Sequence, residues 1–95
     1  MAQRDLAGVV ESVEVVWQYK SSDGKCWKNM DKYYSDLYES QYQQKWSFIT
    51  SDHQYAWKTK NYHYRVDFDT MIQTNETTNT QRGIRRTIVV RLVDA

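Results

Sequence analysis

Proline is absent from this 95-residue chain, cysteine occurs once and glycine three times. The lone Cys26 excludes an internal disulfide and fits a reducing compartment, so we expect an intracellular protein, nuclear and/or cytoplasmic. The charged segment after Met1 is not a signal peptide. No apolar run approaches the roughly 20 residues of a membrane span, so we expect no membrane partner. The lack of proline suggests a domain cut from a longer protein.

The motifs of phosphate-binding loops, metal sites and nucleophilic catalysis are also missing. The three glycines are isolated, so neither glycine-rich phosphate motif is present. His53, His63 and Cys26 lack the spacing of metal ligands. Asp67 and Asp69 share one face of a predicted strand, where paired acids are usually solvated. A Ser–His–Asp set stays possible, but nothing marks a nucleophile. We therefore predict no catalytic residue, no metal and no cofactor.

The charge is nearly balanced, with 13 basic and 12 acidic side chains and a net charge of +1. This balance argues against general attraction to nucleic acid or to membranes, and we expect no DNA partner. The balance is uneven along the chain, because residues 77–93 contain four arginines and no acid. The C-terminal quarter is therefore locally basic.

Aromatic residues are abundant, with four Trp, eight Tyr and two Phe, whereas Leu and Ile are few. This composition is typical of a small β-rich domain whose core is built from rings, or of one with an aromatic-lined pocket. The length suits one domain. We expect residues 1–12 to be a flexible lead-in and residues 13–93 to form the single domain.

The hydrophobic pattern predicts one helix and several strands. Asp31 is a plausible N-cap for a helix over residues 32–44, whose apolar stripe must be covered by a sheet. That stripe contains Tyr34, Leu37, Tyr38 and Tyr42. The predicted strands are residues 13–20, 26–30, 46–52, 55–60, 62–73 and 82–93, with turns at Asp23-Gly24 and over residues 75–80.

The stretch from Tyr62 to Arg86 brings three kinds of recognition group into one predicted hairpin. Tyr64 offers a ring, Gln73 an amide and Arg82 a guanidinium. Together they suit a flat heterocycle attached to phosphate. The alternative is an ordinary hairpin with an aromatic core face and a solvated basic tip.

Trp17, Trp27 and Glu39 follow one another at ordered intervals, in VVWQYKSSDGKCWKNMDKYYSDLYESQY, and YRVDFDTMIQTNETTNTQRGIRR comes later. The chain resembles the WWE domain, which is found in ubiquitin ligases and in proteins of the poly(ADP-ribose) polymerase family. The match runs from about Val15 to Arg86. It implies an α+β half-barrel of about six mainly antiparallel strands curled round one helix. It also implies a non-catalytic reader that binds ADP-ribose units of poly(ADP-ribose), either terminal ADP-ribose or internal iso-ADP-ribose. The parent protein would be an ADP-ribosyltransferase or a ubiquitin ligase, and its partners poly(ADP-ribose) or ADP-ribosylated proteins.

The resemblance also implies roles for individual residues. Trp17 and Glu39 are expected to be structural, Trp17 in the core and Glu39 bonded to strand backbone or to an arginine. The expected ligand-binding residues are Tyr19, Trp27, Tyr64, Gln73 and Arg82, with help from Arg85 or Arg86. Gln73 can donate and accept at once and so can read an adenine edge, while the arginines would meet phosphate.

Several alternatives stay open. Trp27 serves equally as pocket wall or core, Tyr19 could cap the barrel rim, and Gln81 or Arg85 could replace Arg82. Gly83 stands where a further basic residue is expected. The long segment 43–63 either extends the pocket or covers it; it adds Trp46, Tyr55, Trp57 and Tyr62. A covered pocket would leave a protein-interaction module. A single-stranded nucleic-acid binder is the other alternative.

Overall fold

The computed structural model describes residues 8–47 and 53–94. In these ranges one helix accompanies six strands: β1 (Gly8–Lys20), β2 (Trp27–Asn29), α1 (Lys32–Ser47), β3 (Gln54–Lys58), β4 (His63–Asp67), β5 (Ile72–Asn75) and β6 (Thr80–Asp94). The strands form one sheet in the order β2-β1-β6-β5-β4-β3, and every neighbouring pair is antiparallel. The sheet curls without closing, so the predicted α+β half-barrel is confirmed.

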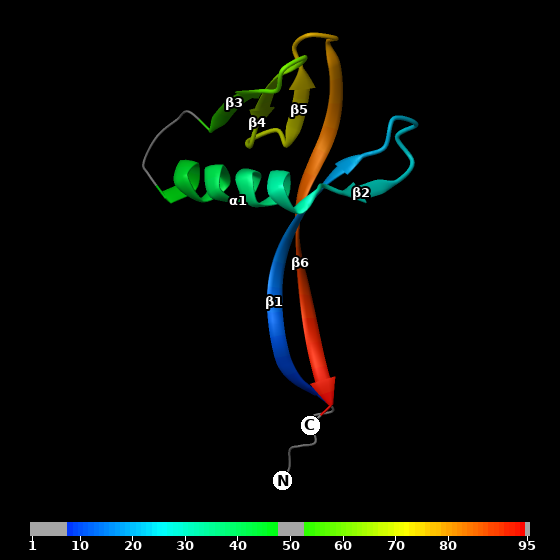
Figure 1. Cartoon of the computed structure of the whole chain (residues 1–95), viewed down its shortest axis with the longest axis vertical. Coiled ribbons are helices and arrows are strands. Elements are labelled where there is room, and N and C mark those ends of the chain that lie inside the picture. The colour runs from blue at the N-terminus through cyan, green and yellow to red at the C-terminus, as the bar shows by residue number, and fades with distance from the viewer. Residues whose placement is uncertain (1–7, 48–52, 95) are drawn as a thin grey trace.

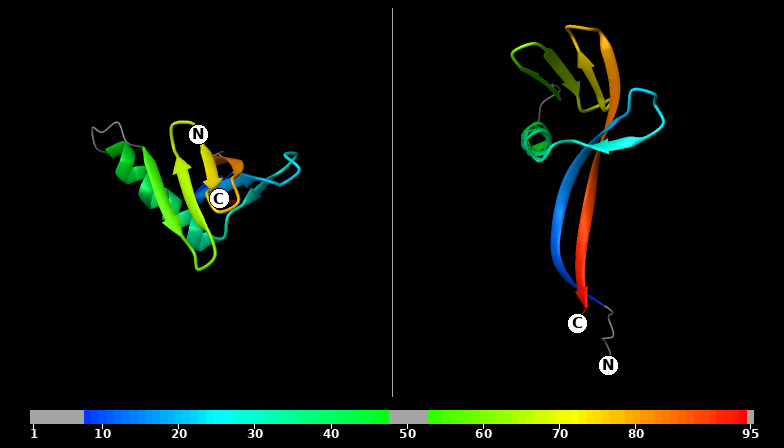
Figure 2. Two further views of the ribbon diagram at one scale, coloured as in Figure 1. Left: turned by 90° about the horizontal axis from the view of Figure 1, so that it is seen from above. Right: turned by 45° about the vertical axis from the view of Figure 1, so that its right-hand side comes forward.

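The two longest strands, β1 and β6, connect the two parts of the molecule. Their upper portions belong to the curled sheet, and their lower portions continue as a two-stranded ribbon toward the termini (Figure 1). The helix crosses the sheet where the ribbon begins. In the right-hand view of Figure 2 it is seen nearly end-on, below β3–β5 and beside the β1–β2 hairpin. The helix therefore supports both halves of the sheet.

The core is built largely from aromatic rings. The buried hydrophobic residues among those described are Trp17, Tyr38, Val66, Phe68 and Ile84. The Trp17 ring meets Tyr38 and Phe68 edge-on, with centroids 5.9 and 5.6 Å away. Such pairs add about 0.5–1.5 kcal/mol each beyond their buried area. Rings thus supply most of the core volume in a sequence that has few Leu and Ile.

The helix extends further than the sequence predicted. The predicted stripe faces the sheet, with Tyr38 fully buried and its neighbours partly buried. The helix ends at Ser47 instead of residue 44, so the predicted strand over 46–52 is wrong at Trp46 and Ser47; its remainder lies outside the described residues. Trp46 packs against Tyr42 one turn earlier, with centroids 6.0 Å apart. Aromatic contacts at this spacing stabilise a helix, which explains the extra turn.

Two further predictions about strands need correction. The first strand, predicted over residues 13–20, begins earlier, at Gly8, because residues 8–10 and Ser12 pair with residues 91–94. The register shifts between Val10 and Ser12, and this irregularity interrupts the alternation that would have revealed the strand.

The predicted strand over residues 62–73 is in fact two strands, β4 and β5. Asp67 Oδ1 accepts hydrogen bonds from the backbone N–H groups of Asp69 and Thr70, at 2.8 and 3.2 Å. Met71 then adopts a positive φ of 57°. An aspartate that bonds the backbone two residues ahead makes a turn, and here it reverses the chain. The alternation of Tyr64, Val66 and Phe68 toward the core holds up to that point.

The remaining boundaries agree closely with the predictions. The first hairpin turns at Gly24, which has a φ of 73°. β2 and β3 fall within or beside the predicted strands at 26–30 and 55–60, and β6 begins two residues before the predicted strand at 82–93. Among the described residues no helix is long and apolar enough to cross a membrane.

Candidate functional site

A concave pocket of about 690 Å³ opens between the start of α1, the β1–β2 hairpin and the strands β3–β6. This volume is within the range of sites for nucleotide-sized ligands. Four of the six predicted ligand-binding residues lie in it, and each comes from a different strand. They are Tyr19, Tyr64, Gln73 and Arg82.

The sheet register explains why these four side chains converge. Gln73 on β5 and Arg82 on β6 are directly opposite each other. Tyr64 on β4 is opposite Asn75, two residues along the same face of β5. Directly opposed residues on one face have Cβ atoms about 4.5–5.5 Å apart. An amide and a guanidinium are therefore neighbours, with a phenol ring one strand further on.

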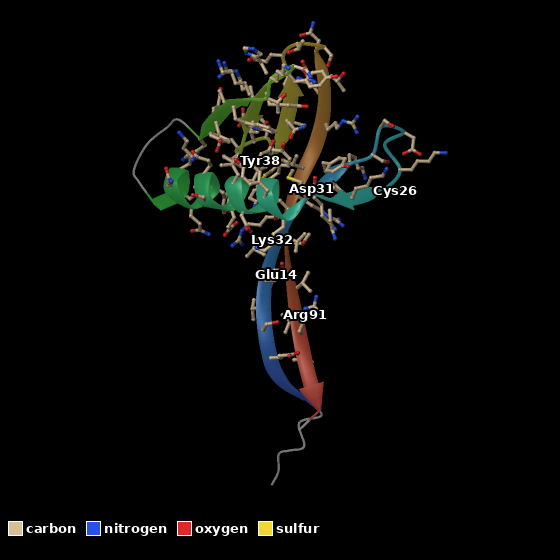
Figure 3. The ribbon with its side chains drawn as sticks, viewed as in Figure 1. Glu14, Cys26, Asp31, Lys32, Tyr38 and Arg91 are labelled. Atoms are coloured by element: carbon tan, nitrogen blue, oxygen red, sulfur yellow. The ribbon has the colours of Figure 1, made fainter. Side chains whose placement is uncertain are left out.

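Gln73 is tied to the helix by a chain of hydrogen bonds. The hydroxyl of Tyr38 donates to Gln73 Oε1, and the indole Nε1 of Trp57 donates to that same hydroxyl at 3.2 Å. Burial raises the pKa of Tyr38 far above its ordinary value. The hydroxyl therefore keeps its proton and remains a donor. Figure 3 shows Tyr38 on the side of the helix that faces β3–β5.

An aromatic wall forms the side of the pocket toward β3. The Trp57 ring stacks on Tyr64 at 4.4 Å and 18°, and Tyr34 and Tyr62 adjoin this pair at 5.2 and 6.2 Å. Burial raises the pKa of the Tyr64 phenol, which stays protonated. All four rings line the pocket. Trp57 and Tyr62, which belong to the described part of the long segment after the helix, thus form part of the pocket lining.

Arg82 supplies positive charge within the pocket. Its Nη1 donates to the backbone oxygen of Lys20 at 3.2 Å, and its guanidinium lies 5.9 Å from the Tyr19 ring centroid. Within the described part of the chain no carboxylate pairs with it. The charged lining residues are Lys28, Asp31 and Arg82, two cations against one anion. The pocket can therefore accept an anion.

The other two predicted ligand-binding residues, Trp27 and Arg85, do not line the pocket; they lie on the opposite face of the sheet. Trp27 is opposite Lys20, and Arg85 is opposite Gln18. Side chains alternate along a strand, so these positions point away from the face that Tyr19 occupies. There the Arg85 guanidinium lies 4.3 Å from the Trp27 ring centroid, and its Nε donates to Gln18 Oε1.

Gly83 belongs to the same outer surface. A Cβ added at Gly83 would lie 3.7 Å from the Trp27 ring, which is ordinary contact distance. The position where a basic residue was expected therefore faces Trp27 and not the pocket. Gln81, a sequence alternative to Arg82, borders a separate groove with Arg65 and Asp67.

Trp17 and Glu39 form the scaffold beneath the pocket. Trp17 is fully buried, and its Nε1 donates to Glu39 Oε1 at 3.0 Å. Arg86 donates from Nε and Nη2 to the two carboxylate oxygens, both at 2.8 Å. These bonds, the Arg86 pair first, lower the pKa of Glu39 to about 2. Arg86 is thereby occupied and does not line the pocket.

The candidate catalytic groups have structural partners. Asp67 holds the β4–β5 turn, and Asp69 contacts His53 Nδ1 at 2.7 Å. His53 also stacks on Trp46 at 4.0 Å. Within residues 8–47 and 53–94 no three His, Cys, Asp or Glu side chains gather as metal ligands would.

A curled antiparallel sheet with one supporting helix and an aromatic, amide and arginine pocket defines a small binding domain. A family model described as "WWE domain" matches residues 15–86, which is most of the chain. The chain belongs to the WWE domain family, a family of interaction modules associated with ADP-ribose or protein binding. A search of curated proteins returned no match.

Trp57 is the pocket residue that sequence reasoning did not single out. The sequence offered it only as one of four aromatics in a long segment with two possible roles. Its signal was the alternation of Tyr55 and Trp57, which places both on the inner face of β3. Tyr38 was likewise expected only as part of the helix stripe, yet its hydroxyl reaches the pocket.

Proposed function

We propose that this domain is a non-catalytic reader that binds ADP-ribose units of poly(ADP-ribose), as terminal ADP-ribose or internal iso-ADP-ribose. The observation that carries the proposal is the convergence of Tyr64, Gln73 and Arg82 on one open pocket. A nucleotide diphosphate needs a flat apolar surface, a hydrogen-bonding group for the base and a cation for phosphate. The three side chains supply these in adjacent positions.

Each side chain has a role that follows from its surroundings. Trp57 covers one face of Tyr64, so a base or ribose would pack against the remaining surface of Tyr64 and against Tyr19. Arg82 has donors beyond the one that bonds Lys20 and would hold phosphate with its planar fork. Gln73 would bond the base.

The natural partners would be poly(ADP-ribose) or ADP-ribosylated proteins inside the cell, in the nucleus and/or cytoplasm. The parent protein would be an ADP-ribosyltransferase or a ubiquitin ligase, with this segment acting as its targeting module. The open pocket favours this reading over a protein-interaction module whose pocket is covered by the long segment after the helix.

The test is calorimetric titration of the domain with ADP-ribose, iso-ADP-ribose and ATP. We expect binding, and the ranking of the ligands reports which end of the polymer is read. Arg82→Ala should weaken binding at least about tenfold, since a hydrogen bond to a charged group contributes about 1.5–3 kcal/mol. Gln73→Ala should weaken it by about two- to tenfold, since a neutral hydrogen bond contributes about 0.5–1.5 kcal/mol.

The chain provides matched controls for both variants. Gln81→Ala and Arg85→Ala remove the same functional groups from neighbouring positions outside the pocket. They should change affinity less than about twofold. If all three ligands fail to bind at millimolar concentration, or if Arg85→Ala weakens binding as much as Arg82→Ala, the proposal is wrong. Binding of single-stranded RNA that weakens steeply with salt, and that ignores Gln73→Ala, would favour a nucleic-acid binder.

A further inference from the structure

The hydrogen bonds that link Trp57, Tyr38 and Gln73 have only one possible direction. An indole N–H can donate but cannot accept. Trp57 Nε1 therefore donates to the Tyr38 oxygen. The Tyr38 hydroxyl has a single hydrogen, which it directs to Gln73. Gln73 must receive that hydrogen with its carbonyl oxygen.

This direction fixes which end of the Gln73 amide faces the pocket. Oε1 is bonded to the buried Tyr38 hydroxyl, so Nε2 carries both of its hydrogens toward the ligand side. Among the described residues nothing accepts from Gln73 Nε2. An amide turned by 180° would donate to the Tyr38 oxygen, and the hydrogen of that buried hydroxyl would be left without an acceptor. An unpaired buried polar group costs about 1–3 kcal/mol.

We propose that Tyr38 and Trp57 are specificity-determining positioning residues, which hold Gln73 as a pure hydrogen-bond donor and so select ligands that present an acceptor to it. The inference rests on the proposed nucleotide-binding function of the same pocket. It differs from the expectation that Gln73 both donates to and accepts from the ligand. On the Watson–Crick edge of adenine, Gln73 meets the acceptor N1 and not the N6 amino group. A hypoxanthine base carries N–H at position 1, so Gln73 can bond it only after the base shifts to present O6, and its binding is weakened.

Tyr38 and Trp57 act by orienting the Gln73 amide. Variants that lose their hydrogen-bonding groups but keep an aromatic ring therefore test this role. Trp57→Phe keeps a ring that can stack on Tyr64 and removes the indole N–H together with one ring of the indole. Tyr38→Phe keeps the buried ring and removes only the hydroxyl. In either variant Gln73 gains the freedom to turn its oxygen toward the ligand.

The experiment measures the dissociation constants of ADP-ribose and of its hypoxanthine analogue, inosine diphosphate ribose, for the wild-type domain and both variants. The wild type should prefer ADP-ribose by at least about tenfold, since a site built for one hydrogen-bonding partner rejects its counterpart strongly. In Trp57→Phe and Tyr38→Phe the ratio should fall below about threefold, mainly because the analogue binds better. Tyr42→Phe, one turn along the helix and outside the pocket, should leave the ratio unchanged.

The ratio of the two affinities separates this inference from the function on which it rests. The proposed function is refuted if the wild-type domain binds neither of these ligands and also fails to bind iso-ADP-ribose. The role of Tyr38 and Trp57 is refuted, and the proposed function is not, in either of two cases. In the first, the wild-type domain binds ADP-ribose and the analogue equally well. In the second, the variants keep the wild-type preference. If Tyr38→Phe does not fold, Trp57→Phe still tests the inference, because Trp57 belongs to the same hydrogen-bond network and is only partly buried.

Discussion

The carboxylate of Glu39 connects the helix to the two long strands β1 and β6, and its neutralisation is the most direct test of the scaffold. It accepts four hydrogen bonds: one from Trp17, two from Arg86 and one from Gln43. Glu39→Gln preserves the size of the side chain. It removes the negative charge and replaces one acceptor oxygen by an NH₂ group, which would face the donors of Arg86 or Gln43.

The loss of stability in Glu39→Gln can be estimated from the number of these hydrogen bonds and from the solvent exposure of the side chains that form them. Hydrogen bonds to charged groups contribute about 1.5–3 kcal/mol each. The side chains of Glu39 and Arg86 are 23% and 26% exposed, so water screens part of their attraction. We therefore expect Glu39→Gln to lower the free energy of unfolding by about 2–3 kcal/mol at pH 7. For a domain of this size that corresponds to a melting temperature lower by roughly 8–24 °C.

The effect must depend on pH in a defined direction. The bonds from Arg86 lower the pKa of Glu39 from its ordinary value of 4.5 to about 2 in the folded state. On acidification the unfolded chain therefore takes up this proton before the folded chain does. The stability that the carboxylate contributes is complete above about pH 4.5 and is lost as the pH falls toward 2. The difference between wild type and Glu39→Gln should narrow over that interval.

Urea unfolding followed by tryptophan fluorescence, at several pH values from 7 to 2.5, measures both effects. Asp36→Asn is the matched control, an acid-to-amide change on the same helix. Asp36 pairs with Lys32 at 2.8 Å, but their side chains are 61% and 78% exposed. That pair should contribute no more than about 0.5 kcal/mol. The reasoning fails if Glu39→Gln costs no more than Asp36→Asn, or if its cost is the same at pH 3 as at pH 7.

Two further predictions concern the backbone. Gly24→Ala should lower the free energy of unfolding by about 1 kcal/mol, because Gly24 has a positive φ although the space around it is empty. Gly83→Ala should change it by no more than about 0.5 kcal/mol, because the added Cβ would be at ordinary contact distance from Trp27. Equal losses for the two variants in urea unfolding would contradict this account. In the ribbon below the helix, Val13, Ile88, Val90 and Leu92 are 50–61% exposed, and a two-stranded ribbon is marginally stable in water. Hydrogen exchange of the amides of residues 88–92 should therefore be faster than that of residues 82–86, and equal protection of the two segments would show that the ribbon is as stable as the sheet.

The sequence was sufficient to predict the fold because the elements that build the core have clear periodicity. Trp17 lies within an alternating strand, and Tyr34, Leu37 and Tyr38 recur at helical spacing. The position of Trp27 could not be predicted, for the opposite reason. Its strand has only three residues, so no alternation reveals its orientation, and only the pairing with Lys20 determines it.

The contacts that orient the site could not be predicted in the same way. Trp57 and Tyr38 are 19 residues apart, and Tyr38 and Gln73 are 35 residues apart. Their contact depends on how β3, β4 and β5 pair, and the turn at Asp67 that sets this pairing looked like the middle of one strand. A side-chain hydrogen bond to the backbone reverses the chain there without any glycine or proline to signal it.

The placement of Tyr38 next to Glu39 explains how one helix serves both the scaffold and the pocket. Successive residues on a helix point about 100° apart, so adjacent side chains reach different strands. Glu39 bonds Trp17 on β1 and Arg86 on β6, while Tyr38 bonds Gln73 on β5 and Trp57 on β3. Since the sheet curls, a single helix turn spans the distance between its two halves. The same turn that anchors the helix to β1 and β6 therefore determines which end of the Gln73 amide faces a ligand.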